Sequence, residues 1–266
     1  MANYAYIGTY ARSGSTFLCE LLKNFQEFQV FHEIFHFHLS AITSYLPDIF
    51  PDLKIRLGLP EDEALAREAL CSDPLRYLDA VQEFYPRKIL AFKVFPGHLA
   101  SGPLLDLADH SRLLILLHRN LVHTYISTKI ANAIQQWSQV DTSCQHVAFD
   151  PAEFRTFADR TLDAQRYLKH HAATNGLPLV EFTYEALAAA DDPCTLVADA
   201  LVRDLGLSLT RCDRPLDIAR QDKRSLASEK VSNPEEMRAF LRECGLESLD
   251  DATQPNPPLE SPFFNS

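Results

Sequence analysis

Residues 4–22 carry the densest group of side chains able to bind a charged ligand. An apolar run is followed by a loop of small and hydroxylated residues and then by a helix-like segment. A loop at a helix N-terminus gathers unpaired backbone N–H groups at the positive end of the helix dipole, which suits a phosphate or a sulfate. Arg12 adds a fixed positive charge, and Gly14 lets the backbone come close. The hydroxyls of Ser15 and Thr16 complete a predicted anion-binding loop.

The spacing of this loop differs from that of the loop that binds magnesium and a nucleoside triphosphate. That loop needs G-x-x-x-x-G-K-[ST], in which Lys reaches the terminal phosphates and Ser or Thr holds magnesium. Here Gly8 and Gly14 are one residue too far apart, and Ser15 stands where Lys belongs. The sequence also shows no clear Asp-ended second strand for magnesium. A phosphate-loop nucleotide kinase is therefore the less favoured alternative.

A second candidate anion site lies near the middle of the chain. Residues 113–117 form a continuous apolar run, the pattern of a strand buried on both faces of a parallel sheet. Arg119 follows this run, at the carboxyl end where open α/β sheets bind their ligands. The guanidinium fork of Arg suits a phosphate, and Ser127 follows eight residues later on a helix-like stretch. A surface Arg and an ordinary helix Ser are the alternative.

Together these two segments resemble the sulfotransferases that use 3′-phosphoadenosine 5′-phosphosulfate (PAPS). The run Arg-Ser-Gly-Ser-Thr at residues 12–16 matches the [KR]-S-G-[ST]-[ST] loop of that family, and its 3′-phosphate site has the same Arg…Ser spacing. The resemblance implies that PAPS donates the sulfuryl group and leaves as 3′,5′-diphosphoadenosine (PAP), without a metal ion. It assigns the 5′-phosphosulfate to Arg12, Ser13, Gly14, Ser15 and Thr16, and the 3′-phosphate to Arg119 and Ser127.

Three further segments fit the same family. Residues 220–225, with the Asn-Pro-Glu-Glu run that follows, resemble the late basic loop that folds over the nucleotide end in many bacterial members. Lys223 and Arg224 are the candidate contacts there, and a solvated basic turn before an Asn-capped helix is an equal alternative. Residues 89–95 resemble the family's strand that carries a Lys. Residues 179–187 resemble its YE-x-L turn from strand to helix.

The segment after the second strand-like run holds the candidate bases. Sulfuryl transfer to an alcohol is an in-line displacement that needs a base at the acceptor oxygen and cations around the moving group. In the bacterial branch that sulfates trehalose, which the chain resembles most, the base is a Glu in the place of Glu33. Animal cytosolic members use a His, so His36 and then His32 are the next candidates. The resemblance assigns charge stabilisation on the bridging oxygen to Arg12 and to Lys93.

The same segment matches the zinc-protease motif H-E-x-x-H at residues 32–36. That motif works on a helix, where both His lie on one face with Glu as the general base. The flanking residues are rich in Phe and β-branched side chains, which favours a short strand running into a turn. A zinc hydrolase is therefore disfavoured, and a capping or core role is the remaining alternative for these side chains.

The pattern of apolar runs predicts an α/β fold that would bring these segments together. Strand-like runs alternate with helix-like stretches, as in a parallel sheet with helices on both faces. Strands are expected at residues 4–10, 28–31, 88–95, 113–118 and 178–183. Helices are expected at residues 15–25, 61–71, 97–108, 121–136, 151–174, 193–205 and 234–244. With the family resemblance, this gives a three-layer, P-loop-like fold with a central, mostly parallel sheet flanked by helices.

The chain is expected to form one sulfotransferase domain over residues 1–250. Its 266 residues suffice for one large α/β domain, and no Gly/Ser- or Pro-rich linker divides it. Residues 36–85 hold more helix than one crossover needs and are expected to form an inserted helical cap on the acceptor side. Residues 251–266 are polar and Pro-rich and are expected to be flexible or strapped to the surface.

Composition and net charge limit the classes of partner that the protein is expected to bind. A net charge of −11 argues against a nucleic-acid-binding surface. No stretch reaches the ~18–20 apolar residues of a membrane span. Because a strand is expected close to Met1, no signal peptide is expected. The six Cys show no C-x-x-C pair, as in reduced cytoplasmic proteins. The expected acceptor is a hydroxyl of a carbohydrate, lipid or small-molecule alcohol. The sequence is compatible with a homodimer. The alternative to an enzyme is a catalytically inactive module that binds a nucleotide.

Overall fold

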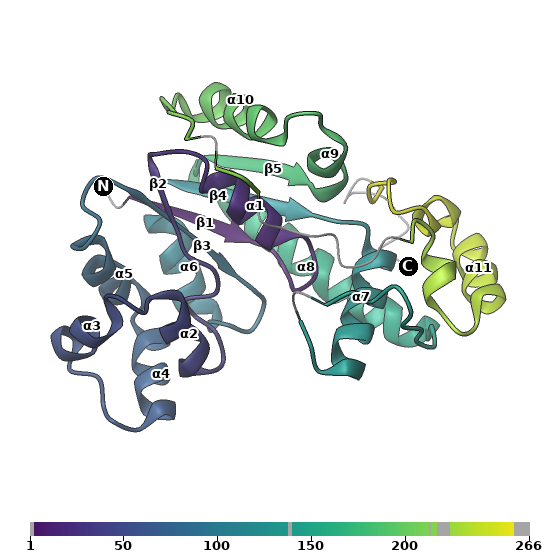
Figure 1. Ribbon diagram of the computed structural model, residues 1–266, viewed down its shortest axis with the longest axis horizontal. Coiled ribbons are helices and arrows are strands. Elements are labelled where there is room, and N and C mark those ends of the chain that lie inside the picture. The colour runs from purple at the N-terminus through teal and green to yellow at the C-terminus, as the bar shows by residue number, and fades with distance from the viewer. Residues whose placement is uncertain (1–2, 138–139, 213, 217–223, 258–266) are drawn as a thin grey trace.

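The computed structural model describes residues 3–137, 140–212, 214–216 and 224–257. At its centre is a five-stranded sheet in the order β2-β3-β1-β4-β5, in which every pairing is parallel (Figure 1). The strands are β1 (Tyr4–Gly8), β2 (Phe28–Val30), β3 (Ile89–Val94), β4 (Leu113–His118) and β5 (Leu179–Thr183). The five predicted strands and the parallel α/β class are thereby confirmed.

Parallel strands bring the candidate site residues to one edge of the sheet. Gly8 at the end of β1 is in register with Val94 of β3 and with Leu116 of β4. The anion loop follows β1, Glu33 follows β2 and Arg119 follows β4. All of them therefore lie at the carboxyl edge, where this kind of sheet binds ligands.

Helices cover both faces of the sheet. Side chains alternate along β1, so that Tyr6 joins one hydrophobic core and Ile7 joins the other. The covering helices are α6 (Ser101–His110) and α8 (Pro151–Asn175) on the Tyr6 face, and α1 (Ser15–Leu22) and α10 (Pro193–Leu205) on the Ile7 face. Central strands buried on both faces explain why their sequences are almost continuously apolar.

Four short helices separate β2 from β3 in the chain. They are α2 (Leu39–Tyr45), α3 (Phe50–Leu57), α4 (Glu63–Ser72) and α5 (Pro74–Gln82). They gather at one end of the molecule, near α6 (Figure 1). Ile42, Leu53 and Tyr77 join the core on the Tyr6 face of the sheet. Residues 36–85 therefore do carry extra helix, although the sequence pattern indicated only the one at residues 61–71.

The remaining helices surround α7 (Leu121–Ile134). A third hydrophobic core joins α7 to the first half of α8, to the 3-10 helix η1 (Ala227–Lys230) and to α11 (Pro234–Glu243). The short helix α9 (Tyr184–Ala189) follows β5, and η2 (Glu247–Asp250) follows α11. Across the described ranges, none of the helices combines the length and the apolar character that crossing a bilayer requires.

The described part of the C-terminal tail, residues 251–257, lies against the start of α7. Asn120 Nδ2 donates to three backbone carbonyls within residues 249–254. Asn256 Nδ2 donates to the carbonyl oxygen of Arg119 at 2.7 Å. This segment is therefore strapped beside the end of β4, and the rest of the predicted tail lies outside the described residues.

Candidate active site

The anion loop joins β1 to α1 through two residues with a left-handed backbone. The φ angle is 64° at Arg12 and 85° at Gly14, so the chain turns sharply just before the helix. Ser13 is buried, and its Oγ lies 2.6 Å from Thr9 Oγ1, which ties the loop to the end of β1. Gly14 is the N-cap of α1, and no side chain among the described residues caps this helix. The N–H groups of its first turn therefore face the loop without a side-chain cap.

Gly14 packs against the ring of Tyr184, the first residue of α9. A Cβ at position 14 would lie 2.2 Å from Tyr184 Cδ2, so only glycine fits. The same ring stacks on the guanidinium of Arg119, whose Cζ lies 4.4 Å from the ring centroid. Tyr184 therefore sets the spacing between the anion loop and Arg119, a role that the YE-x-L resemblance did not specify.

We expect Gly14→Ala to lower the free energy of unfolding by roughly 2 kcal/mol or more, because alanine is strained at positive φ and its Cβ would collide with Tyr184. Thermal unfolding measures the change. Gly102→Ala is the matched control, since nothing lies within 4 Å of a Cβ added there in α6. A Gly14→Ala variant as stable as the wild type would contradict this loop conformation.

The two predicted anion sites meet at Arg12. Its Nε donates to Ser127 Oγ at 2.9 Å, and its Nη1 donates to the carbonyl oxygen of Trp137. Arg119 Nη1 donates to the carbonyl oxygen of Arg12 at 2.6 Å. Burial and the nearby charge of Arg119 lower the pKa of Arg12. An anion bound beside the two guanidinium groups would relieve their mutual repulsion.

Lys93 connects the anion loop to Glu33. This side chain is 3% exposed, and it emerges near the carboxyl end of β3. Its Nζ donates to Thr16 Oγ1 at 3.1 Å and lies 3.2 Å from Glu33 Oε1. The structure thus brings together three residues that the sequence proposed separately, from the loop, from the segment after β2 and from β3.

Two imidazole rings face the other carboxylate oxygen of Glu33. The backbone N–H groups of His38 and Phe95 donate to the Nδ1 atoms of His36 and His98, at 3.0 Å and 3.2 Å. A ring whose Nδ1 accepts a hydrogen bond carries its proton on Nε2 when neutral. The two Nε2 atoms lie 3.8 Å and 4.0 Å from Glu33 Oε2. Both rings therefore point an N–H group towards Glu33, which favours Glu33 over His36 as the proton acceptor.

His98 is a member of this cluster that the sequence did not reveal. It lies in the loop between β3 and α6, outside every motif, and its side chain is almost fully buried. Burial lowers the pKa of His98 to about 3, with smaller contributions from His36, Arg67 and Lys93. The ring is therefore neutral at physiological pH, with its tautomer set by the Phe95 N–H.

His98 should make the protein less stable in mild acid. Its pKa is about 3 when folded and about 6.5 when unfolded. The unfolded chain therefore binds the proton first, and stability present above pH 6.5 is lost as the pH falls towards 3. The loss between pH 6.5 and pH 4 is expected to be about 2–4 kcal/mol. Urea unfolding across this range should show a shallower pH slope for His98→Asn, whereas the exposed His170→Asn serves as the control. An unchanged slope in His98→Asn would contradict the neutral buried ring.

The zinc-protease motif does not fold as that motif requires. Residues 32–36 form a turn in which the His36 N–H donates to the Glu33 carbonyl oxygen at 2.9 Å, which confirms the non-helical prediction. His32 Nε2 lies 3.7 Å from a carboxylate oxygen of Glu20, and burial lowers the pKa of His32 to about 3, helped by the charges of Lys93 and Lys23. Within the described part of the chain, no group of three or more metal-ligating side chains is assembled.

The late basic loop is described only from Arg224 onwards, so Lys223 lies outside the described residues. The Arg224 guanidinium donates to the carbonyl oxygens of Thr142, Gln145 and Glu229 at 2.9–3.0 Å. These bonds hold the segment before α8 against η1. Contact between Arg224 and a nucleotide stays a prediction.

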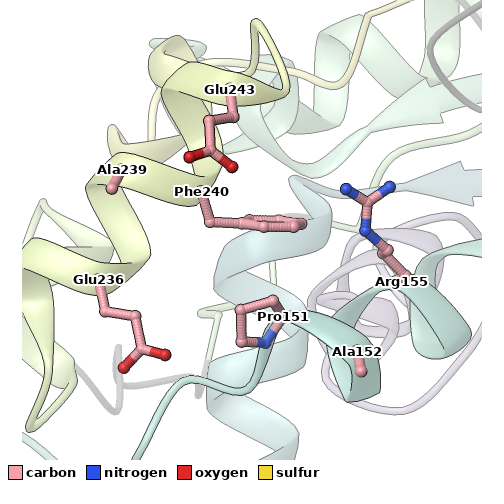
Figure 2. Close-up of a pocket in the computed structure, with 7 residues that line it drawn as sticks. All are labelled: Pro151, Ala152, Arg155, Glu236, Ala239, Phe240 and Glu243. Atoms are coloured by element: carbon pink, nitrogen blue, oxygen red, sulfur yellow. The ribbon is translucent and has the colours of Figure 1, made fainter.

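A cavity of about 410 Å³ lies apart from these residues, between the start of α8 and α11. Figure 2 shows the Phe240 ring at its centre, with Arg155 on one side and Glu236 and Glu243 on α11. Arg155 Cζ lies 5.0 Å from the Phe240 ring centroid. The cavity shares no lining residue with the loop, Glu33 or Arg119.

Comparisons with known proteins give a likeness in structure. No family model matches the sequence, and no curated protein matches it. Among solved structures, the chain is similar to one titled "Sulfotransferase Domain from the Curacin Biosynthetic Pathway", with a TM-score of 0.50 and 16% sequence identity. The match covers 100% of this chain and 96% of that one. The chain therefore has the fold of a sulfotransferase domain.

Proposed function

We propose that the chain transfers a sulfuryl group from PAPS to the hydroxyl group of an acceptor. The observation that carries this proposal is the contact of Lys93 with both the anion loop and Glu33. It joins a candidate base to a candidate sulfate site at the carboxyl edge of a sulfotransferase fold. The likeness in fold to a sulfotransferase domain supports the same conclusion.

The residues at the sheet edge fit a donor with two anionic ends. The first turn of α1, with the hydroxyls of Ser15 and Thr16, would hold the 5′-phosphosulfate. Arg119 and Ser127 would hold the 3′-phosphate. Arg12 touches Ser127 and accepts a bond from Arg119, so its charge would be shared between the two ends. This set is cationic, as a bisphosphorylated nucleotide requires, against an acidic chain of net charge −11.

In this proposal Glu33 takes the proton of the acceptor hydroxyl as that oxygen attacks sulfur. A new S–O bond forms, the bond between sulfur and the 5′-phosphate oxygen breaks, and PAP leaves with the electron pair. Lys93 stabilises charge on the bridging oxygen, because its Nζ already bonds Thr16 of the loop. The N–H groups of His36 and His98 lie 3.8 Å and 4.0 Å from Glu33 Oε2 and would limit the movement of the carboxylate. We assign no metal ion.

The finer parts of the proposal concern the acceptor side. Glu33 and His36 lead directly into α2, so we place the helical insertion of residues 36–85 around the acceptor. Arg67 of α4 supports this placement, because it donates to the carbonyl oxygens of His36 and His98 at 3.3 Å and 3.0 Å. We also propose that the chain is related to the branch that sulfates trehalose, that it is located in the cytoplasm and that it can form a homodimer.

Calorimetry with PAP and with ATP tests the donor assignment. We expect PAP to bind at least about tenfold more tightly than ATP and without magnesium, since only PAP carries a 3′-phosphate for Arg119. Tighter, magnesium-dependent ATP binding would favour the kinase instead. Transfer from labelled PAPS to a panel of alcohols, or its slow hydrolysis, then separates an enzyme from an inactive nucleotide-binding module.

A further inference from the structure

A second cavity, of about 190 Å³, lies against the carboxyl ends of β1 and β3, between α6 and α8. Most of its wall is apolar and includes Tyr6, Val94, Leu104 and Leu168. A cavity of about 150 Å³ can hold a benzene ring, so this one has room for a group slightly larger than a ring. Apolar walls with few polar groups are typical of small-molecule sites.

Gln165 supplies an unpaired polar group in this wall. The residue is 3% exposed, and neither its Oε1 nor its Nε2 has a hydrogen-bond partner in the described structure. The Tyr10 hydroxyl interacts with the Gln165 side chain without a hydrogen bond of ordinary geometry, and it donates to the Arg119 carbonyl oxygen at 3.2 Å. A buried amide without partners destabilises a protein, and a leucine would avoid that cost. The amide therefore calls for a ligand that pairs with it.

The cavity adjoins the place where the reaction is proposed to occur. Phe95 lines it, and the Phe95 ring lies 5.6 Å from Lys93 Nζ and 5.0 Å from the His98 ring. Thr9 and Tyr10, which begin the anion loop, line it as well. Phe95 thus faces the cavity and also lies near Lys93 and His98, two neighbours of Glu33.

We infer that this cavity binds the apolar end of the acceptor, and that the acceptor carries an amide group that pairs with Gln165. The inference rests on the proposed function. A carboxamide presents a donor and an acceptor side by side, and its complement is a second amide or an equivalent donor–acceptor pair. The acceptor class is therefore an apolar alcohol that bears an amide, as opposed to a free carbohydrate.

Two probes of similar shape test the cavity, benzamide and isopropylbenzene. Only benzamide can pair with Gln165, because isopropylbenzene replaces the amide with two methyl groups. Ligand-observed NMR or calorimetry on the full chain should show tighter binding of benzamide by about tenfold or more. Equal binding of both probes, or tighter binding of isopropylbenzene, would overturn the role of the amide. Failure of both probes to bind would overturn the site.

Gln165→Leu separates a ligand-binding role from a structural one. We expect this variant to reverse the preference to isopropylbenzene and to raise Tm by about 2–4 °C, because an unpaired buried amide is removed. A lower Tm would show that Gln165 stabilises the fold, and the inference would fail. Gln26→Leu, at an exposed position before β2, is the matched control. Ala164→Phe fills the cavity and should abolish benzamide binding. This variant tests whether benzamide binds in the cavity if Gln165→Leu does not fold.

PAP binding, measured on the same samples, keeps this inference apart from the proposed function. If the unaltered chain binds PAP normally but shows no preference for benzamide, the amide-bearing acceptor is overturned and the sulfotransferase proposal stands. Benzamide binding that Ala164→Phe abolishes, in a chain that does not bind PAP, would support the amide site and overturn the donor assignment. An alcohol that bears a benzamide group should then compete with benzamide for the cavity and accept sulfate from labelled PAPS.

Discussion

Glu33→Gln is expected to lower kcat for sulfuryl transfer by about 10²–10⁴-fold and to leave the affinity for PAP unchanged. The amide keeps the size of the carboxylate and its acceptor oxygen but cannot take a proton from an alcohol. Lys93 and the two imidazole N–H groups surround this carboxylate within 3.2–4.0 Å, so they restrict its orientation. No other carboxylate contacts Lys93 among the described ion pairs.

Single-turnover kinetics with labelled PAPS, alongside calorimetry with PAP, measure the effect. Glu68→Gln, at an exposed position on α4, is the control and should leave kcat unchanged. His36→Asn discriminates between the candidate bases, because it should cost only a few-fold if His36 orients Glu33. A Glu33→Gln variant with full turnover would remove Glu33 from the role, and a greater loss in His36→Asn would transfer the role to His36.

The strands and the anion loop could be predicted because their signals are local. Residues 113–117 are apolar without interruption, and the loop combines glycine, hydroxyls and Arg within five positions. The end of β1 was placed two residues too late, at residue 10 in place of Gly8. Thr9 and Tyr10 look strand-like in sequence, but the Thr9 hydroxyl pairs with Ser13 and begins the loop. The strand propensity of single residues contains no information about such a contact.

The short helices of the insertion could not be predicted with the same certainty. Helices α2, α3 and α5 span 7, 8 and 9 residues. Isolated helices of that length are marginal, and packing against the rest of the protein must stabilise them. In α2 and α3 the buried side chains that supply this packing are Ile42, Phe50 and Leu53, which are too few to form a clear periodic pattern.

The candidate site contains contacts that depend on the whole fold. Arg12 was assigned to the sulfate from its place in the loop, yet its Nε bonds Ser127, 115 residues further on. His98 reaches Glu33 only because β2 and β3 are neighbours in the sheet. Gln165 looks like a polar helix residue in sequence, and its burial is a property of the packed structure. Such residues carry no motif, so three-dimensional structure is needed to find them.

Arg119→Lys should weaken PAP binding by about 10–150-fold and adenosine 5′-phosphate binding by only a few-fold. Hydrogen bonds to charged groups contribute about 1.5–3 kcal/mol, and lysine keeps the charge of Arg119 but lacks the planar fork that matches a phosphate. Adenosine 5′-phosphate has no 3′-phosphate, so loss of the Arg119 fork should change its affinity very little. Calorimetry with both nucleotides gives the ratio of the two effects.

The ratio matters because Arg119 also has a structural role. It donates to the Arg12 carbonyl oxygen and stacks on Tyr184, so any replacement can disturb the anion loop. A disturbed loop would weaken both nucleotides alike, since both carry a 5′-phosphate, whereas loss of the 3′-phosphate contact weakens PAP alone. Arg160→Lys, at an exposed position on α8, controls for the substitution itself. Equal losses for the two nucleotides would therefore make Arg119 a support of the loop and refute its assignment to the 3′-phosphate.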